Sequence, residues 1–326
     1  MSRRRRIFLV AWLALALGLT SLAAAGSVWG AFSSQNAANA ANTITAATDF
    51  RAPTSSATTI AKTTGGIDGF IKNSGTYYVY ANVTDTGSPA SGVLTVTANV
   101  STITSGQTAV ALAAGSFTAD GVSYNRRSAS LTAGSALAEG TLSYSLTMTD
   151  VAANSNTEGG LTVTVDNTAP TASNIQTTSG GVIAGRPDGG DKITYTFSEA
   201  PDPQSILAGW TGASTGVVVR VNNATNDNVT IFNSTNATQL PLGSINLGRT
   251  DYTTANITFG ASGTASTMVL SGNQLVVTLG TQSAAGTTAA ATGTMIWTPS
   301  ATVTDPAGNA ATTATATESG AADKDF

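Results

Sequence analysis

Apolar and polar residues alternate along much of the chain after residue 76, and this alternation predicts β-strands. The stretch 141–149, Thr-Leu-Ser-Tyr-Ser-Leu-Thr-Met-Thr, alternates over its whole length, which is typical of a strand with one face buried. Further strands are expected at residues 77–83, 92–100, 160–165, 192–198, 216–221, 228–232, 268–270, 274–279, 294–297 and 311–317. After residue 30, no stretch carries an apolar stripe of helical period.

The expected strands form two groups, which Asp166–Thr171 separates. Short strands with turn-forming residues between them predict β-sandwiches or barrels. Pro170 fixes its own φ and biases Ala169 toward extended geometry, so a stiff junction is expected there. We therefore expect an all-β fold with two tandem sandwiches. The expected organisation is a spacer or first strand at 31–69, sandwiches at 70–168 and 169–318, and an acidic tail at 319–326.

The first thirty residues have the three-part pattern of a secretory signal peptide. Arg3–Arg6 form a positive start, Ile7–Ala25 carry no charge, and three alanines close the run. The alternative is a retained membrane anchor, because the uncharged run is long enough to span a bilayer. Both interpretations of residues 1–30 place the body of the protein outside the cytoplasm, secreted or at the cell surface.

Composition excludes several function classes. The chain has no His and no Cys, so it has no imidazole base, no thiolate nucleophile and no disulfide framework. Only 10% of the residues are charged, against about 25% in an average soluble protein. Removal of Arg3–Arg6 leaves 10 cations against 18 anions and changes the net charge from −4 to −8. A mildly acidic body disfavours nucleic acid as a partner.

Aromatic side chains are few, and those within expected strands are the best candidates for the core. Buried aromatics contribute large apolar areas to a core. The leading core candidates are Tyr77, Tyr80, Tyr144, Tyr195, Phe197, Phe232 and Trp297.

Several short motifs resemble bacterial Ig-like domains. Residues 149–154, Thr-Asp-Val-Ala-Ala-Asn, and the later 163–170, Val-Thr-Val-Asp-Asn-Thr-Ala-Pro, resemble the final turn and the linker of such domains. The turn recurs at 304–309 as Thr-Asp-Pro-Ala-Gly-Asn. Residues 193–203, which include Phe-Ser-Glu-Ala-Pro-Asp-Pro, resemble a strand and turn of S-layer-type Ig-like domains.

The resemblance covers about residues 70–317 and implies two Ig-like β-sandwiches of a secreted or surface-exposed structural or adhesive protein. The second unit departs from a minimal Ig-like domain through additional residues around 210–248. Residues 31–35 and 42–47 are also similar to the start of exported matrix-fibre or camelysin-like proteins, which would imply assembly into fibres.

Among the candidate ligands, calcium is the one that the chemistry of the residues supports most directly. It prefers carboxylate, amide and carbonyl oxygens held on loops, and loops gather at one end of an Ig-like sandwich. The candidate metal ligands are Asp85, Asp150, Asn154, Asp166 and Asn167. The alternative is that these side chains cap their own turns. No other cofactor is expected.

Catalysis is not expected. Glu199, Asp202, Asp188 and Asp191 are close in sequence, but glycoside hydrolysis needs two carboxyl groups that face each other across a cleft. Nothing in the sequence places them so, and no catalytic residue is assigned.

The sequence thus favours a non-enzymatic structural or adhesive protein. One alternative is an extracellular module that binds a carbohydrate or a peptide, with Trp210 as a ligand contact. Another is a fibre-forming matrix subunit. The partner would be an extracellular protein or glycan of unknown identity, and membrane contact would be limited to an uncleaved N-terminal segment.

Overall fold

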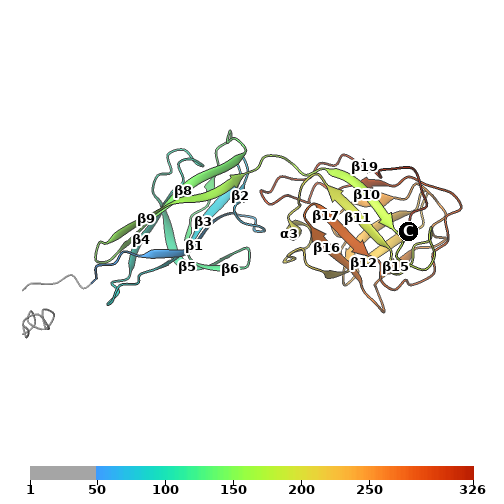
Figure 1. The fold of residues 1–326 in the computed structure, drawn as a ribbon, viewed down its shortest axis with the longest axis horizontal. Helices are drawn as coiled ribbons and strands as arrows, with labels where there is room; N and C mark the ends of the chain where they lie inside the picture. Colours follow the sequence, from blue (N-terminus) through green and yellow to red (C-terminus); the bar gives the residue numbers. More distant parts are fainter. Residues whose placement is uncertain (1–48) are drawn as a thin grey trace, which may run out of the picture. The chain divides into compact units, whose positions relative to one another are not determined.

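The computed structural model describes residues 49–326, and the predicted signal peptide or anchor at 1–30 lies outside them. The fold is nearly all-β, with 44% of residues in strands and 1% in helix. The strands make two sheets with sandwich-like or barrel-like arrangements, as Figure 1 shows. No helix among residues 49–326 combines the length and apolar character needed to cross a membrane.

The first sheet contains nine strands between residues 54 and 165. They are β1 (Thr54–Lys62), β2 (Phe70–Ile71), β3 (Thr76–Thr84), β4 (Val93–Asn99), β5 (Val110–Ala119), β6 (Val122–Ser128), β7 (Leu131–Thr132), β8 (Gly140–Asp150) and β9 (Ser155–Val165). Their order is β1-β3-β6-β5-β4-β8-β9-β2, with β7 beside β3. β1 lies within residues 31–69, the stretch expected to be a spacer or a first strand, so the first sheet begins before residue 70.

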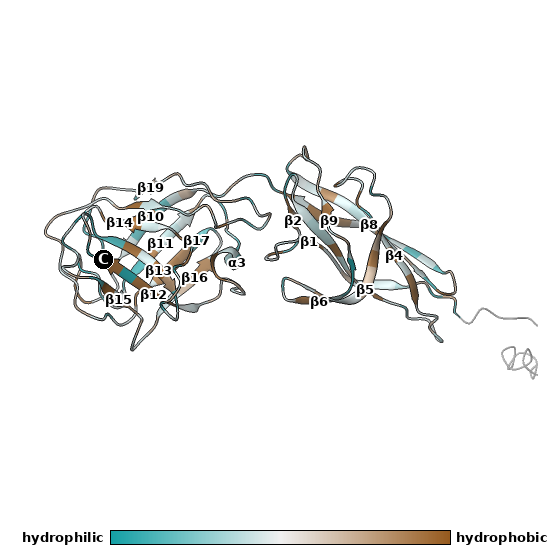
Figure 2. Ribbon diagram, turned by 180° about the vertical axis from the view of Figure 1, so that it is seen from behind, coloured by the Kyte–Doolittle hydropathy of each residue, from teal (hydrophilic) through white to brown (hydrophobic). Residues whose placement is uncertain are grey.

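The predicted alternation at 141–149 is found in β8. Tyr144, Leu146 and Met148 point into a buried cluster, while the residues between them are less buried. Figure 2 shows the same interchange of hydrophobic and hydrophilic residues along several strands. Tyr80 is buried too, but it belongs to a small separate cluster with Ala61 and Tyr124.

The second sheet contains ten strands between residues 172 and 317. They are β10 (Ala172–Thr178), β11 (Lys192–Phe197), β12 (Thr215–Asn222), β13 (Asn228–Asn233), β14 (Ser244–Asn246), β15 (Ile257–Phe259), β16 (Ser266–Ser271), β17 (Gln274–Thr278), β18 (Ile296–Thr298) and β19 (Ala316–Thr317). The order is β10-β11-β17-β16-β12-β13-β14-β18-β19, with β15 beside β12. A single helical turn, α3 (Pro203–Ile206), follows β11.

Side chains connect the two ends of the second sheet. The Asn174 side chain in β10 donates to Ser319 Oγ at 3.0 Å and accepts from Ser319 N at 2.8 Å. Gln176 Nε2 donates to Ser319 O at 2.8 Å. Ser319 lies two residues after the end of β19, so these bonds join β10 to the segment that follows the last strand and give the sheet its barrel-like closure.

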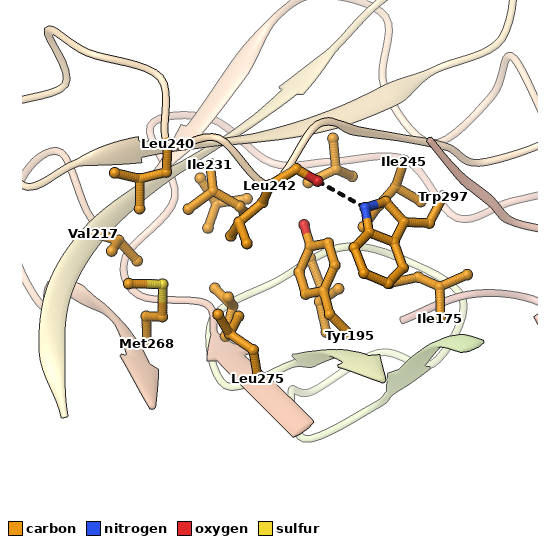
Figure 3. Close-up of a cluster of buried hydrophobic side chains, with 14 of the residues drawn as sticks. Ile175, Tyr195, Val217, Ile231, Leu240, Leu242, Ile245, Met268, Leu275 and Trp297 are labelled. Carbon is orange, nitrogen blue, oxygen red and sulfur yellow. Dashed lines mark hydrogen bonds between the residues drawn. The ribbon is translucent and has the colours of Figure 1, made fainter. Parts of the chain in front are cut away.

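The core of the second sheet is built around Trp297. The rings of Tyr195 and Phe197 meet Trp297 edge to face, with centroids 5.1 and 4.9 Å away. Trp297 Nε1 donates to Leu242 O at 2.7 Å, as Figure 3 shows. Leu242 comes from the additional residues around 210–248, which therefore complete this core.

The expectation that Phe232 is a core residue is wrong. Val229 and Ile231 in β13 point into the core, so the alternation of the strand turns Phe232 toward the other face. Its ring is half-buried there under the Arg220 guanidinium, which lies 3.6 Å from the ring centroid.

The expected acidic tail is packed against the second sheet. Phe326 is only 2% exposed and meets the Tyr252 ring edge to face. Asp325 is also buried, and its carboxylate accepts a hydrogen bond from Tyr252 Oη at 3.1 Å.

Candidate functional site

Three groups of three carboxylates occur among residues 49–326. The group of Glu318, Asp323 and Asp325 lies near the C-terminus, and the other two groups, one beside each sheet, share a common arrangement. The first acidic cluster consists of Asp49, Asp85 and Asp150. The second acidic cluster consists of Asp166, Glu199 and Asp305. Within each cluster, one carboxylate oxygen per residue lies within 4.8 Å of the others.

Both clusters are assembled from the same three places in their halves of the chain. One residue precedes the first strand of the half, as Asp49 precedes β1 and Asp166 precedes β10. Another follows the strand paired with it, as Asp85 follows β3 and Glu199 follows β11. Because these strand pairs are antiparallel, the start of one lies beside the end of the other. The third residue is the Asp of the repeated Thr-Asp turn.

In the first cluster, an asparagine closes the repeated turn. Asp150 Oδ1 accepts a hydrogen bond from Asn154 N at 2.8 Å, and its Oδ2 accepts from Asn154 Nδ2 at 2.7 Å. The same Nδ2 donates to Asp49 O at 3.1 Å. Asn154 therefore fastens the segment that enters the sheet to the turn that precedes its last long strand.

The second cluster repeats this lock bond for bond. Asp305 accepts from Asn309 N at 2.8 Å and from Asn309 Nδ2 at 2.7 Å. Asn309 Nδ2 also donates to Asp166 O, at 2.9 Å. We call each set of bonds an Asp–Asn lock. The repeat of the turn seen in the sequence is thus a repeat in three dimensions.

The carboxylates of the first cluster are well supplied with hydrogen-bond donors. Asp49 accepts from the main-chain N of Arg51 and of Ser91, both at 2.9 Å. These bonds lower the pKa of Asp49, and the bond from Arg51 has the largest effect. Asp85 Oδ2 accepts from Gly92 N at 2.6 Å. Main-chain dipoles therefore stabilise ionised carboxylates in this cluster.

The negative charge of the second acidic cluster is less well compensated by its surroundings. Burial raises the pKa of Glu199 to about 7, and the charges of Asp166 and Asp305 add to the effect. Burial also raises the pKa of Asp166. Glu199 Oε1 is buried and has no hydrogen-bond partner. When all three groups are ionised, this cluster holds negative charge that its surroundings do not neutralise.

The five predicted metal ligands do not come together in one site. Asp85, Asp150 and Asn154 lie at the first cluster, whereas Asp166 lies in the second. Asn167 belongs to neither cluster: its Oδ1 accepts from Asn73 N at 2.8 Å, and its Nδ2 donates to Leu137 O at 3.2 Å.

Asp49 was not predicted as a cluster member, Asp305 was interpreted only as part of a turn, and Glu199 was considered only as a catalytic acid. A signal was present, because Asp-x-x-Ala-Pro-Thr occurs at both 49–54 and 166–171. Oxygen-rich clusters of this type suit Ca²⁺. The locks show that Asp150 and Asp305 also have the turn-closing role of the alternative interpretation. Calcium binding stays a prediction.

The remaining acidic candidates are engaged in structural contacts. Asp191 accepts from the main-chain N of Gly180 and of Gly181, at 3.0 and 2.9 Å. Asp202 caps α3 through Gln204 N at 3.0 Å and pairs with Lys62 Nζ at 2.7 Å.

Trp210, the predicted ligand contact, lies in the core of the second sheet. It is 6% exposed, and its Nε1 donates to Ala213 O. Its ring is therefore not presented to solvent in this structure.

No protein-family model and no curated protein matches the chain. The Ig-like resemblance rests on the short motifs at 149–154, 163–170, 193–203 and 304–309, and it stays a prediction.

Proposed function

We propose that this chain is a secreted or surface-exposed structural or adhesive protein, built from two tandem Ig-like β-sandwiches and without catalytic activity. Its two sheets would present loops to an extracellular protein or glycan. The all-β fold supports this proposal, and so does the lack of His and Cys in the sequence.

The duplicated Asp–Asn lock is the observation that carries the proposal. In each half, one asparagine holds the entering segment against a buried aspartate whose exposed fraction is 0%. A module that fixes its own linker in this way suits a protein that transmits force along its chain. The sparse charge and the engaged carboxylates of Asp188, Asp191 and Asp202 favour a scaffold over an enzyme.

Two lysines add contacts that fit a structural role. Lys62 at the end of β1 is 9% exposed and donates to Asp202 Oδ2 and to Pro306 O, both at 2.7 Å. Lys72 donates to Gly308 O. Both acceptor carbonyls belong to the repeated turn of the second half.

Cell fractionation with mass spectrometry of the N-terminus tests the export on which this proposal depends. We expect the protein in the medium or at the cell surface, with a new N-terminus after Ala25 or with an intact anchor. Recovery of the full chain from the cytosol would overturn the proposal.

A cleavage panel of polysaccharides and peptides tests the non-enzymatic part. We expect no turnover above that of a Glu199→Gln control. Cleavage that the wild type performs and Glu199→Gln loses would show an enzyme instead.

A fibre-forming subunit is the alternative within the structural class, with residues 33–50 as a strand donated to a neighbouring copy. Electron microscopy of a chain that lacks residues 33–48, a deletion that keeps Asp49 of the first acidic cluster, separates the two. Polymers that form with the wild type and vanish with the deletion would favour the fibre.

A further inference from the structure

A cavity with polar and apolar lining lies in the second sheet and includes no residue of either acidic cluster. Its volume is about 570 Å³, which is within the usual size of small-molecule sites. Strands β16 and β17, the segments that adjoin them and the loop of residues 179–191 supply its lining.

One wall of the cavity is a ladder of threonines. Thr267 and Thr278 are directly opposite each other in the β16–β17 pair, so their side chains lie on the same face. Thr281 Oγ1 accepts from Thr264 N at 2.9 Å and keeps its own proton for a further acceptor. With Gln282 at the end of this row, the wall offers hydroxyl and amide groups that suit a hydroxyl-rich ligand.

The facing loop is held in place by two buried aspartates. Asp191, which is 0% exposed, accepts from Gly180 N and Gly181 N. Asp188, which is 3% exposed, accepts from Val182 N at 3.1 Å and from Ile183 N at 3.2 Å. A loop that is already ordered loses little conformational freedom when a ligand binds.

Arg186 supplies the one cationic group of the lining. Its Nη2 is 3.4 Å from Asp188 Oδ2, whereas its Nε is buried and has no hydrogen-bond partner. A guanidinium accommodates a carboxylate through two parallel hydrogen bonds. The Arg186 side chain is 23% exposed, so the guanidinium donors that Asp188 leaves free suit a ligand carboxylate.

We propose that this cavity binds a saccharide that carries a carboxylate, namely a uronic acid unit of a polysaccharide. Arg186 binds the carboxylate, while the threonines and Gln282 bond to ring hydroxyls. This inference goes beyond the structural or adhesive role, and it does not depend on the acidic clusters.

Calorimetric titration of the full chain with a galacturonic acid trisaccharide tests the proposal, with the methyl ester of the same trisaccharide as the neutral comparison. A chelator is present throughout, so that no cation at the acidic clusters contributes. We expect the acid to bind about tenfold or more tightly than the ester. Arg186→Gln should abolish that preference, and Thr267→Val should weaken the binding of both.

Arg51→Gln is the matched control, because Arg51 is an exposed cation before β1 of the first sheet and does not line the cavity. We expect it to leave both affinities unchanged. Arg186→Lys keeps the positive charge but lacks the planar guanidinium, and it replaces Arg186→Gln if that variant does not fold. We expect Arg186→Lys to lose most of the preference for the acid. Equal affinity for acid and ester, no binding of either, or an equal loss in Arg51→Gln would overturn the proposal.

Discussion

Ala153 and Gly308 occupy the same position of the repeated turn, and both have a left-handed backbone. Their φ angles are +68° and +89°. Glycine adopts such angles without steric cost, whereas a Cβ there approaches the backbone closely. Ala153 is therefore a strained residue in a position that the second copy of the turn fills with glycine.

Exchanging these two residues should move stability in opposite directions. We expect Ala153→Gly to stabilise the fold and Gly308→Ala to destabilise it, each by about 0.5–1 kcal/mol, because relief of the left-handed strain exceeds the entropy cost of glycine. A Cβ added at Gly308 meets only Lys62 Cδ, at 3.5 Å, so the backbone angle decides the result. Chemical denaturation measures both changes.

Ala152→Gly is the control, since Ala152 is not among the residues with positive φ. It should destabilise slightly through the flexibility of glycine alone. Equal effects of glycine at 152 and 153 would contradict the strain argument.

At the scale of the elements, the sequence predicted the strands whose alternation is clear, whereas β5, β6 and β10, with seven to ten residues each, lie outside every expected strand. The alternation at 141–149 identifies β8 because nine residues carry a clear period. β2, β7 and β19 have two residues each, too few for any period, and they exist because their neighbours provide hydrogen bonds. Asp49 was missed for a related reason: it precedes all the periodic sequence and joins its cluster only when β1 pairs with β3.

The Asp–Asn locks should be worth more than ordinary turn hydrogen bonds. We expect Asn154→Ala and Asn309→Ala each to lower the free energy of unfolding by about 2 kcal/mol, because each leaves a fully buried carboxylate without a side-chain donor. Urea denaturation provides the measurement. Asn99→Ala removes an exposed asparagine that bonds only within its own turn, and its cost should be below about 0.5 kcal/mol. Similar costs for all three variants would show that the locks are ordinary turns.

For the whole molecule, the buried carboxyl groups predict lower stability in mild alkali than in mild acid. Burial raises the pKa of both Glu199 and Asp325 to about 7, above the 4.5 and 3.8 of their exposed forms. The folded state therefore holds these protons more tightly than the unfolded state, so their contribution is complete below about pH 4 and is lost as the pH rises through about 7. Asp49 and Asp251 have the opposite effect on the pH dependence of stability, because their pKa values are lowered. The largest cause is a hydrogen bond from Arg51 for Asp49 and a hydrogen bond from Arg249 for Asp251.

We therefore expect the melting temperature to be higher at pH 5 than at pH 8. Glu199→Gln should narrow this difference by raising the melting temperature at pH 8, because the amide cannot ionise. Glu158→Gln in β9 is the control and should leave the difference unchanged. A melting temperature that rises from pH 5 to pH 8 would contradict the argument.

The calcium prediction is tested best at pH 8, where the second acidic cluster carries most charge. If the clusters hold the ion, about 1 mM Ca²⁺ should raise the melting temperature, and a chelator should reverse the rise, because a ligand of the folded state alone stabilises it. Glu199→Gln should reduce the rise through the second cluster, and Asp85→Asn should reduce it through the first. An identical melting temperature with calcium and with chelator would show that the clusters do not bind calcium.

The closure between β10 and Ser319, two residues after β19, has a mechanical consequence. There, amide side chains from Asn174 and Gln176 hold Ser319 where a ladder of main-chain bonds would otherwise continue. Such a junction has few bonds to break, and its polar partners are exposed to competing water. Under tension or heating, the second sheet should open at this junction first. The molecule would then lengthen while the core around Trp297 stays packed, because the junction yields before the rest of the fold.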